Sequence, residues 1–144
     1  MTTVTKTVRF DAAHVLSDDR GLCRNLHGHT YRVDVSVSRP DGAPGDMVVD
    51  FRDLKAVLAE VICDRFDHAF VYSTASAGES DIAAAVARQG MRTAPIPFRS
   101  TVENLARHFH GELKARLPGL SEVKVWETPD NCAAYAEDGG DGNG

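Results

Sequence analysis

Alternating apolar and polar residues predict strands near both ends of the chain. Residues 2–10 alternate loosely, and residues 29–38 (HTYRVDVSVS) alternate strictly, with a tyrosine and three valines on one side. Residues 122–128 (EVKVWET) alternate again, and residues 132–135 can pair back with them across a turn at 129–131. A period of two residues is typical of strands with one buried face. The pattern therefore predicts four strands, the last two forming a hairpin.

Apolar residues at helical spacing predict two main helices. The first covers residues 51–66, and Asp50 stands where a helix N-cap belongs. The second opens at Ser100, because Ser100 and Glu103 have the S-x-x-E spacing of a capping box, and it ends before the Pro-Gly pair at 118–119. Each helix carries a single apolar stripe, so each is expected to cover one face of a sheet.

Residues 71–99 lack a clear period, although residues 80–90 (SDIAAAVARQG) favour a short helix that ends at Gly90. The order of the other elements predicts an α+β fold, in which an antiparallel four-stranded sheet of order ββααββ carries the two main helices on one face. We assign a single domain to residues 1–136. Residues 137–144 form a Gly-rich acidic tail that is expected to be disordered.

Composition narrows the class of protein. The chain has 144 residues, of which 42% are hydrophobic and 26% charged, as in an ordinary soluble domain. With 16 basic and 21 acidic residues, the net charge of −5 offers no broad cationic face, so nucleic acid is not expected as a partner.

Cysteine usage and hydropathy predict a cytoplasmic protein. Cys23, Cys63 and Cys132 cannot all pair within one chain and form no CxxC motif, which is typical of a reducing compartment. The first residues lack the apolar core of a signal peptide, and no apolar run approaches the roughly 20 residues of a membrane span. We therefore expect no association with a membrane.

Three histidines are placed in a way that suits a metal ion. His27 and His29 are two residues apart at the start of a strand, so their side chains leave the same face. His14 follows the first strand, which brings its imidazole alongside if the two strands pair. Three imidazoles suit Zn²⁺ and leave a coordination position for water or substrate. An HxH pair alone is common by chance, so these residues do not settle the assignment.

Cys23 lies four residues before His27, in the same loop. Its thiol is either the fourth ligand of a closed structural site or a reactive group beside an open one. A nearby cation, such as zinc or Arg24, favours the thiolate, which can act as a base. Cys63 belongs to the apolar stripe of the first helix and is expected only to pack there.

Two further positions carry acid–base chemistry. Asp67 precedes His68, and such a neighbour can raise imidazole basicity, although such a pair alone is more often a histidine at a helix end with a solvated aspartate. Glu127 ends a strand and is either exposed or a bidentate acceptor for a guanidine-like pair of N–H groups. His108 and His110 lie on a helix and are expected at the surface.

Six segments in order resemble the 6-pyruvoyltetrahydropterin synthase / 6-carboxytetrahydropterin synthase family. They are FDAAH (10–14), CRNLHGHTY (23–31), MVVDF (47–51), DHAF (67–70), TVENLA (101–106) and WETP (126–129). The resemblance runs from about Val8 to Tyr135. The combination of CxxxHGHxY with an upstream AH, a DH after the first helix and a late ET is highly specific.

This resemblance implies a tunnelling fold (T-fold). Small α+β subunits of this fold join their sheets into trimeric barrels, two barrels stack as a hexamer, and the active sites lie between subunits. The protein is therefore expected to be a homo-oligomer that binds a pterin.

The resemblance also implies roles for individual residues. The zinc ligands correspond to His14, His27 and His29. The catalytic cysteine corresponds to Cys23, and the catalytic Asp-His pair to Asp67 and His68. The pterin-anchoring glutamate corresponds to Glu127, and two further pterin contacts correspond to Thr101 and Glu103.

The implied reaction is lyase chemistry on 7,8-dihydroneopterin triphosphate. We favour 6-carboxy-5,6,7,8-tetrahydropterin with release of acetaldehyde and triphosphate, a step toward queuosine and other deazapurines, because the short CxxxHGH loop and compact length resemble the bacterial branch. Elimination of triphosphate to 6-pyruvoyltetrahydropterin is the alternative. A non-catalytic pterin-binding or zinc-stabilised structural protein is the alternative of another class.

One segment departs from the family pattern. Residues 73–99 are longer than the matching link in compact bacterial members, and we expect them to reshape the mouth of the substrate site.

Overall fold

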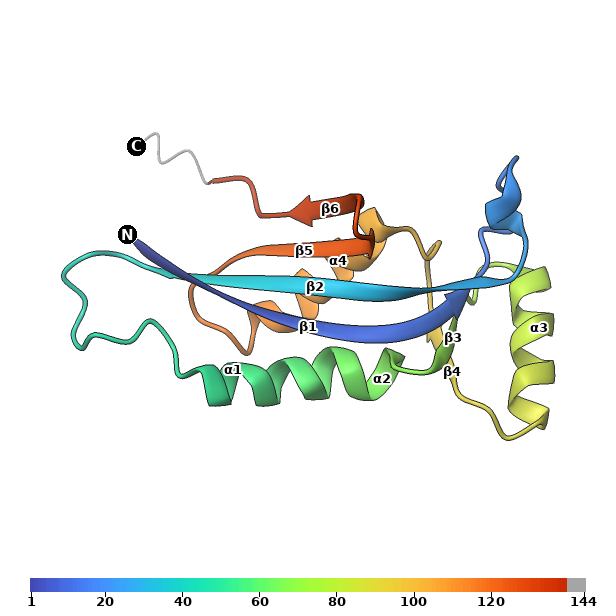
Figure 1. Ribbon diagram of the computed structural model, residues 1–144, viewed down its shortest axis with the longest axis horizontal. Helices are drawn as coiled ribbons and strands as arrows, with labels where there is room; N and C mark the ends of the chain where they lie inside the picture. The colour runs from blue at the N-terminus through green and yellow to red at the C-terminus, as the bar shows by residue number, and fades with distance from the viewer. Residues whose placement is uncertain (140–144) are drawn as a thin grey trace.

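Six strands form one mixed sheet in the order β4-β3-β1-β2-β5-β6 in the computed structural model, which describes residues 1–139 (Figure 1). The strands are β1 Thr2–His14, β2 His27–Arg39, β3 Ala69–Ser73, β4 Thr93–Ile96, β5 Leu120–Thr128 and β6 Asn131–Tyr135. The helical segments are η1 Leu22–Arg24, α1 Phe51–Leu58, the π-helical η2 Ala59–Cys63, α2 Asp64–Phe66, α3 Ala77–Arg88 and α4 Val102–Lys114. None of the described helices is both long and apolar enough to cross a membrane.

The prediction of a four-stranded antiparallel sheet was wrong in the number of strands and in part of the pairing. β1, β2, β5 and β6 are antiparallel as expected, but β3 runs parallel to β1 and β4 parallel to β3. A strand buried on both faces shows no alternation, and four of the five residues of β3 are buried. β4 has four residues and contains Pro95, so neither strand has a pattern that periodicity can detect.

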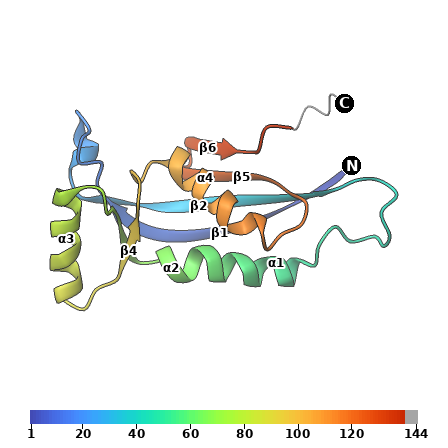
Figure 2. The ribbon, with the colours of Figure 1, turned by 180° about the vertical axis from the view of Figure 1, so that it is seen from behind.

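The two predicted main helices lie on one face of the sheet, as expected (Figure 2). The first is continuous over residues 51–66 as α1, η2 and α2, and Asp50 caps it by accepting a hydrogen bond from the backbone N–H of Arg52. α4 packs on β5 and β6. The inward side chains of the strands and the stripes of these helices form one core, whose large buried side chains include Phe10, Tyr31, Leu54, Leu58, Ile62, Phe66, Leu105, Phe109 and Leu113.

The opposite face of the sheet is polar. Hydroxyl groups pair across β1 and β2 from Thr3 to Ser38 and from Thr5 to Ser36, each at 2.8 Å. Further along, Thr7 Oγ1 donates to Asp34 Oδ1 at 2.6 Å. This face carries no helix in the described chain.

The short helix expected at residues 80–90 exists as α3, which extends from Ala77 to Arg88. It is followed by Gly90, whose φ of 73° is a left-handed conformation that favours glycine after a helix. α3 stands across the end of the sheet, beside β3 and the loop that follows β1 (Figure 1). Val15, Phe70 and Ala83 form a second, small core beneath it.

The predicted tail at 137–144 is described only through residue 139, and residues 140–144 lie outside the described part. In the described part of the tail, Glu137 Oε1 accepts a hydrogen bond from Lys114 Nζ at 2.6 Å.

Candidate metal centre and active site

Strand register brings three histidines together. β1 and β2 pair so that His14 is opposite His27, and the two-residue period puts His29 on the same face. The ring centroids are 4.6 Å apart for His14 and His27, 5.2 Å for His14 and His29, and 5.0 Å for His27 and His29. One nitrogen from each ring lies within 4.8 Å of the other two, which is close enough for one ion.

His14 is held in a single tautomer. It is 0% exposed, and its Nδ1 lies 3.1 Å from the Ser100 carbonyl oxygen and 3.0 Å from Ser100 Oγ. Because a carbonyl oxygen only accepts, Nδ1 carries the proton and Nε2 keeps its lone pair. Burial, followed by the nearby His27 and His29, lowers the pKa of His14 from 6.5 to about 4. The ring is therefore neutral at pH 7.

His27 is held in the same way, since its Nδ1 donates to the Asn25 carbonyl oxygen at 2.6 Å. The Nε2 atoms of His14 and His27 are consequently two lone-pair nitrogens only 3.1 Å apart. His29 Nε2 is buried without a hydrogen-bond partner in residues 1–139. Backbone carbonyls that fix the outer nitrogen are typical of metal-binding histidines, and three neutral imidazoles fit Zn²⁺.

Glu127 reaches the histidines from β5. Its Oε1 lies 3.3 Å from His29 Nε2, without the geometry of a hydrogen bond, and 3.5 Å from His14 Nε2. The pairing of β5 with β6 is irregular between Trp126 and Thr128, and such bulges redirect side chains. Glu127 and His29 also line a cavity beside the histidines.

This cavity has a volume of about 430 Å³. Its lining residues are Arg9, His29, Thr30, Arg32, Trp126, Glu127, Thr128 and Pro129. The Arg32 guanidinium donates to both oxygens of Asp34 at 3.0 Å and lies 5.0 Å from the Trp126 ring centroid. Arg9 forms no ion pair within residues 1–139, so its charge is available to an anion in the cavity.

Cys23 lies outside this cluster. It is exposed in η1, and its sulfur does not join the group of ligand atoms formed by the three histidines in the described chain. Within residues 1–139, Cys23 therefore does not complete a closed four-ligand site with the three histidines.

Asp67 and His68 form a second, separate group. Asp67 Oδ1 lies 3.0 Å from His68 Nδ1 and accepts from the Asp11 backbone N–H at 2.9 Å. That backbone hydrogen bond, and then His68, lower the pKa of the Asp67 carboxyl. His68 has a φ of 58° and is 73% exposed at its side chain, beside Asp11 and Thr30. Asp11 and Thr30 alternate with Ala12 and His29 along their strands, so their side chains leave the opposite face of the sheet from the three histidines. The Asp67–His68 pair beside them therefore faces away from the three histidines of its own chain.

Thr101, not Ser100, caps α4. Thr101 Oγ1 accepts from the Asn104 backbone N–H at 3.2 Å, so the capping box predicted for Ser100 and Glu103 was wrong. Ser100 is 1% exposed and its hydroxyl contacts His14 instead. Glu103 is exposed in the first turn of α4. Neither Thr101 nor Glu103 lines the 430 Å³ cavity.

Sequence reasoning missed the function of Ser100, because the S-x-x-E spacing offered a purely local explanation. It also misplaced two histidines. His110 is 3% exposed and packs on the Tyr135 ring at 5.0 Å, and His108 is half-buried against Phe98 at 5.3 Å. The prediction of surface positions was wrong because the Phe98 and Tyr135 side chains cover these two positions of α4.

Comparison with known proteins gives consistent matches. A sequence model described as 6-pyruvoyl tetrahydropterin synthase matches residues 3–138. A protein of Haemophilus influenzae named 6-carboxy-5,6,7,8-tetrahydropterin synthase is 40% identical, covering 93% of this chain and 98% of its own. A protein of the same name from Aquifex aeolicus is 33% identical, covering 94% and 98%. The solved 6-pyruvoyl tetrahydropterin synthase of Caenorhabditis elegans has the same fold, with a TM-score of 0.68 at 24% identity, covering 95% of this chain and 96% of that one.

Proposed function

The chain belongs to the 6-pyruvoyl tetrahydropterin synthase family, and we propose that it is a zinc-dependent 6-carboxy-5,6,7,8-tetrahydropterin synthase. The family and the lyase class agree with the expectation from sequence. The proposed reaction converts 7,8-dihydroneopterin triphosphate to the carboxypterin with release of acetaldehyde and triphosphate. The observation that carries the proposal is the 40% identity over nearly the whole chain to a protein of that name.

We propose His14, His27 and His29 as the zinc ligands. Support comes from the two Nε2 lone pairs 3.1 Å apart and from the unpartnered His29 Nε2, since each of these arrangements is unfavourable without a cation. When bound, zinc supplies Lewis-acid polarisation of the oxygens on the substrate side chain.

Glu127 is proposed to orient the pterin. A carboxylate can accept two hydrogen bonds from the 2-amino group and the adjacent ring N–H, which fixes the ring in one orientation. Glu127 lies within 3.5 Å of His14 and His29, so a ring held there lies next to the three histidines.

Cys23 and the Asp67–His68 pair are proposed as the proton-transfer groups. Since the pair faces away from the histidines of its own chain, we propose that it serves the site of a neighbouring subunit. Two features support joining of sheets into a barrel: the polar, helix-free face of the sheet, and the long edge of β1 at residues 2–10, which pairs with no strand in the described chain. Thr101 and Glu103 are proposed as further pterin contacts at such an interface.

Two broader features follow from the same family. We propose a homo-oligomer, a trimer or a dimer of trimers, acting in the cytoplasm in a pathway to queuosine or a related deazapurine. Three free cysteines support the reducing compartment.

The product distinguishes the proposal from its alternatives. Zinc-loaded protein is incubated with 7,8-dihydroneopterin triphosphate, and the products are identified by mass spectrometry. Acetaldehyde with a carboxypterin supports the proposal. A pyruvoyl side chain supports the alternative named by the family description, and tight pterin binding without any product under reducing, zinc-replete conditions would mean a non-catalytic protein.

A further inference from the structure

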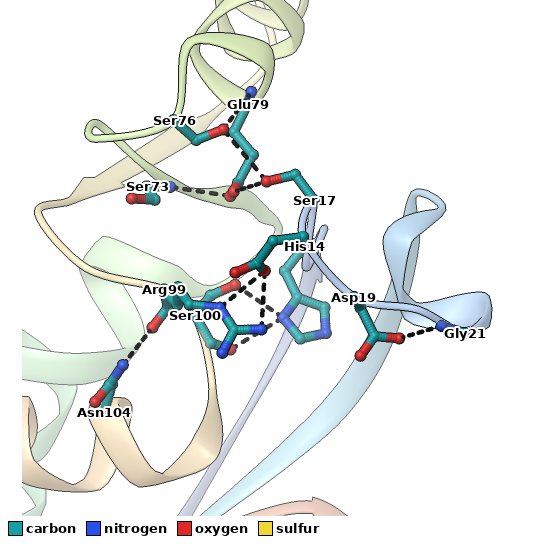
Figure 3. A network of polar contacts seen from close by, with 11 residues as sticks. His14, Ser17, Asp19, Gly21, Ser73, Ser76, Glu79, Arg99, Ser100 and Asn104 are labelled. Carbon is teal, nitrogen blue, oxygen red and sulfur yellow. Dashed lines mark hydrogen bonds and ion pairs between the residues drawn. The ribbon is translucent and has the colours of Figure 1, made fainter.

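A buried carboxylate outside the histidine cluster connects α3 to the loop that carries Cys23. Glu79 lies in the first turn of α3 and is 3% exposed. Its Oε1 accepts from the Ser73 backbone N–H at 3.1 Å, and its Oε2 accepts from Ser17 Oγ at 2.8 Å (Figure 3). Its own backbone N–H donates to Ser76 Oγ, which caps the helix. Both carboxylate oxygens therefore accept hydrogen bonds, one from β3 and one from the loop that follows β1.

No cation accompanies this carboxylate, because Glu79 forms no ion pair within residues 1–139. A buried carboxylate needs hydrogen-bond donors, and here they are the Ser73 backbone N–H and the Ser17 hydroxyl. The geometry therefore indicates that Glu79 holds Ser17 in a defined position, in addition to stabilising α3.

Ser17 connects directly to the backbone around Cys23. It lies in the tight turn from Leu16 to Asp19, where the Asp19 N–H donates to the Leu16 carbonyl at 2.9 Å. The Leu16 N–H in turn donates to the carbonyl oxygen of Cys23 at 2.9 Å. The hydrogen bond between Ser17 and Glu79 therefore holds in place the turn to which the Cys23 backbone is hydrogen-bonded.

The loop has a second attachment next to the histidine cluster. Arg99 donates to Asp18 Oδ1 at 2.9 Å, and the following residue, Ser100, contacts the His14 ring (Figure 3). The Ser17 and Asp18 side chains therefore place the loop between α3 on one side and the segment that orients His14 on the other.

We infer that Glu79 is a positioning residue that sets the place of the Cys23 loop relative to the three-histidine cluster. The inference rests on the proposed function, because it assigns the loop a part in turnover. It also gives the segment at residues 73–99 a specific role: α3 supports the loop from outside. Proton transfer needs its two heavy atoms at hydrogen-bond distance, and a misplacement of about 1 Å can lower a rate by about 100-fold.

The test compares Glu79→Ala with Glu79→Gln. Alanine removes both bonds, so kcat for 7,8-dihydroneopterin triphosphate should fall by about 10- to 100-fold while KM changes by less than about 3-fold. Zinc content should stay at the wild-type level, since Ser100 and Asn25 hold the histidines. Glutamine keeps an acceptor for the Ser73 N–H and an amide for the Ser17 hydroxyl, so it should restore most of kcat.

Asp81→Ala is the matched control. Asp81 lies on the same helix and is exposed, and its substitution removes the same charge, so its kcat should equal that of the wild type. Hydrogen exchange provides the structural measurement: amides of residues 16–25 should exchange faster in Glu79→Ala and not in Asp81→Ala.

Ser17→Ala removes the same bond from the loop side and keeps the test decisive if Glu79→Ala does not fold. It should lower kcat in the same direction as Glu79→Ala. Wild-type kcat in Ser17→Ala, or in a folded Glu79→Ala, would overturn the inference and leave the proposed function intact. Absence of turnover by the wild-type protein would instead contradict the proposed function.

Discussion

Burial of His14 makes the metal-free protein sensitive to acid. Its pKa is lowered from 6.5 to about 4, first by burial and then by His27 and His29. The unfolded chain binds a proton at this ring near pH 6.5, so between these two values the unfolded state holds the extra proton. The contribution of His14 to stability is complete above pH 6.5 and is lost as the pH falls toward 4. One pKa unit corresponds to about 1.4 kcal/mol, so the full effect is about 3 kcal/mol.

Urea unfolding of zinc-free protein from about pH 7 to about pH 4 measures this effect. His14→Gln keeps a donor for the Ser100 carbonyl but cannot be protonated, so the wild type should lose about 3 kcal/mol more than this variant across the range. His68→Gln, at a side chain that is 73% exposed, is the matched control and should follow the wild type. Parallel pH curves for the wild type and His14→Gln would refute the reasoning, because His14 would then titrate equally in both states.

Three further outcomes follow from the site. Cys23→Ala should keep one zinc per chain and lower kcat by about 100-fold or more, measured by metal analysis and product formation; loss of the metal would identify Cys23 as a ligand instead. Glu127→Gln removes a charged acceptor worth about 1.5 to 3 kcal/mol, so KM for the pterin should rise by about 10- to 100-fold with zinc retained, and loss of zinc would contradict the assignment to the pterin. Ser100→Ala leaves the carbonyl that holds His14, so competition with a chelator should show zinc affinity reduced by no more than about 10-fold, and a larger loss would mean that the hydroxyl is the main contact.

The long antiparallel strands were predictable because each has one buried face. β1 and β2 extend over 13 residues each, so the alternation of apolar and polar residues can be detected even where single positions depart from it. β3 and β4 were not predictable in the same way. They are short, and β3 is buried on both faces, with Ala69 and Val71 in the main core and Phe70 in the small core beneath α3, so neither face carries exposed polar residues.

Local motifs predicted which histidines lie together, but they were wrong about the helix cap. HxH with an upstream histidine identified the residues that the fold brings together, because β1 and β2 pair in an unbroken register that ends at His14 and His27. The S-x-x-E spacing at Ser100 failed, since the adjacent Thr101 can also cap the helix and a buried imidazole competes for the serine hydroxyl.

By itself, then, the sequence determined the chemistry available to this protein: its histidines, its loop cysteine, its Asp-His pair and the family to which their order belongs. These depend on residue types and spacing along a single chain. Only the tertiary structure decided that Ser100 orients His14, that Asp67 and His68 face away from the histidines of their own chain, and that Glu79 is fastened to Ser17. Those facts depend on strand register and on which face each side chain leaves, and neither is set by neighbours in sequence.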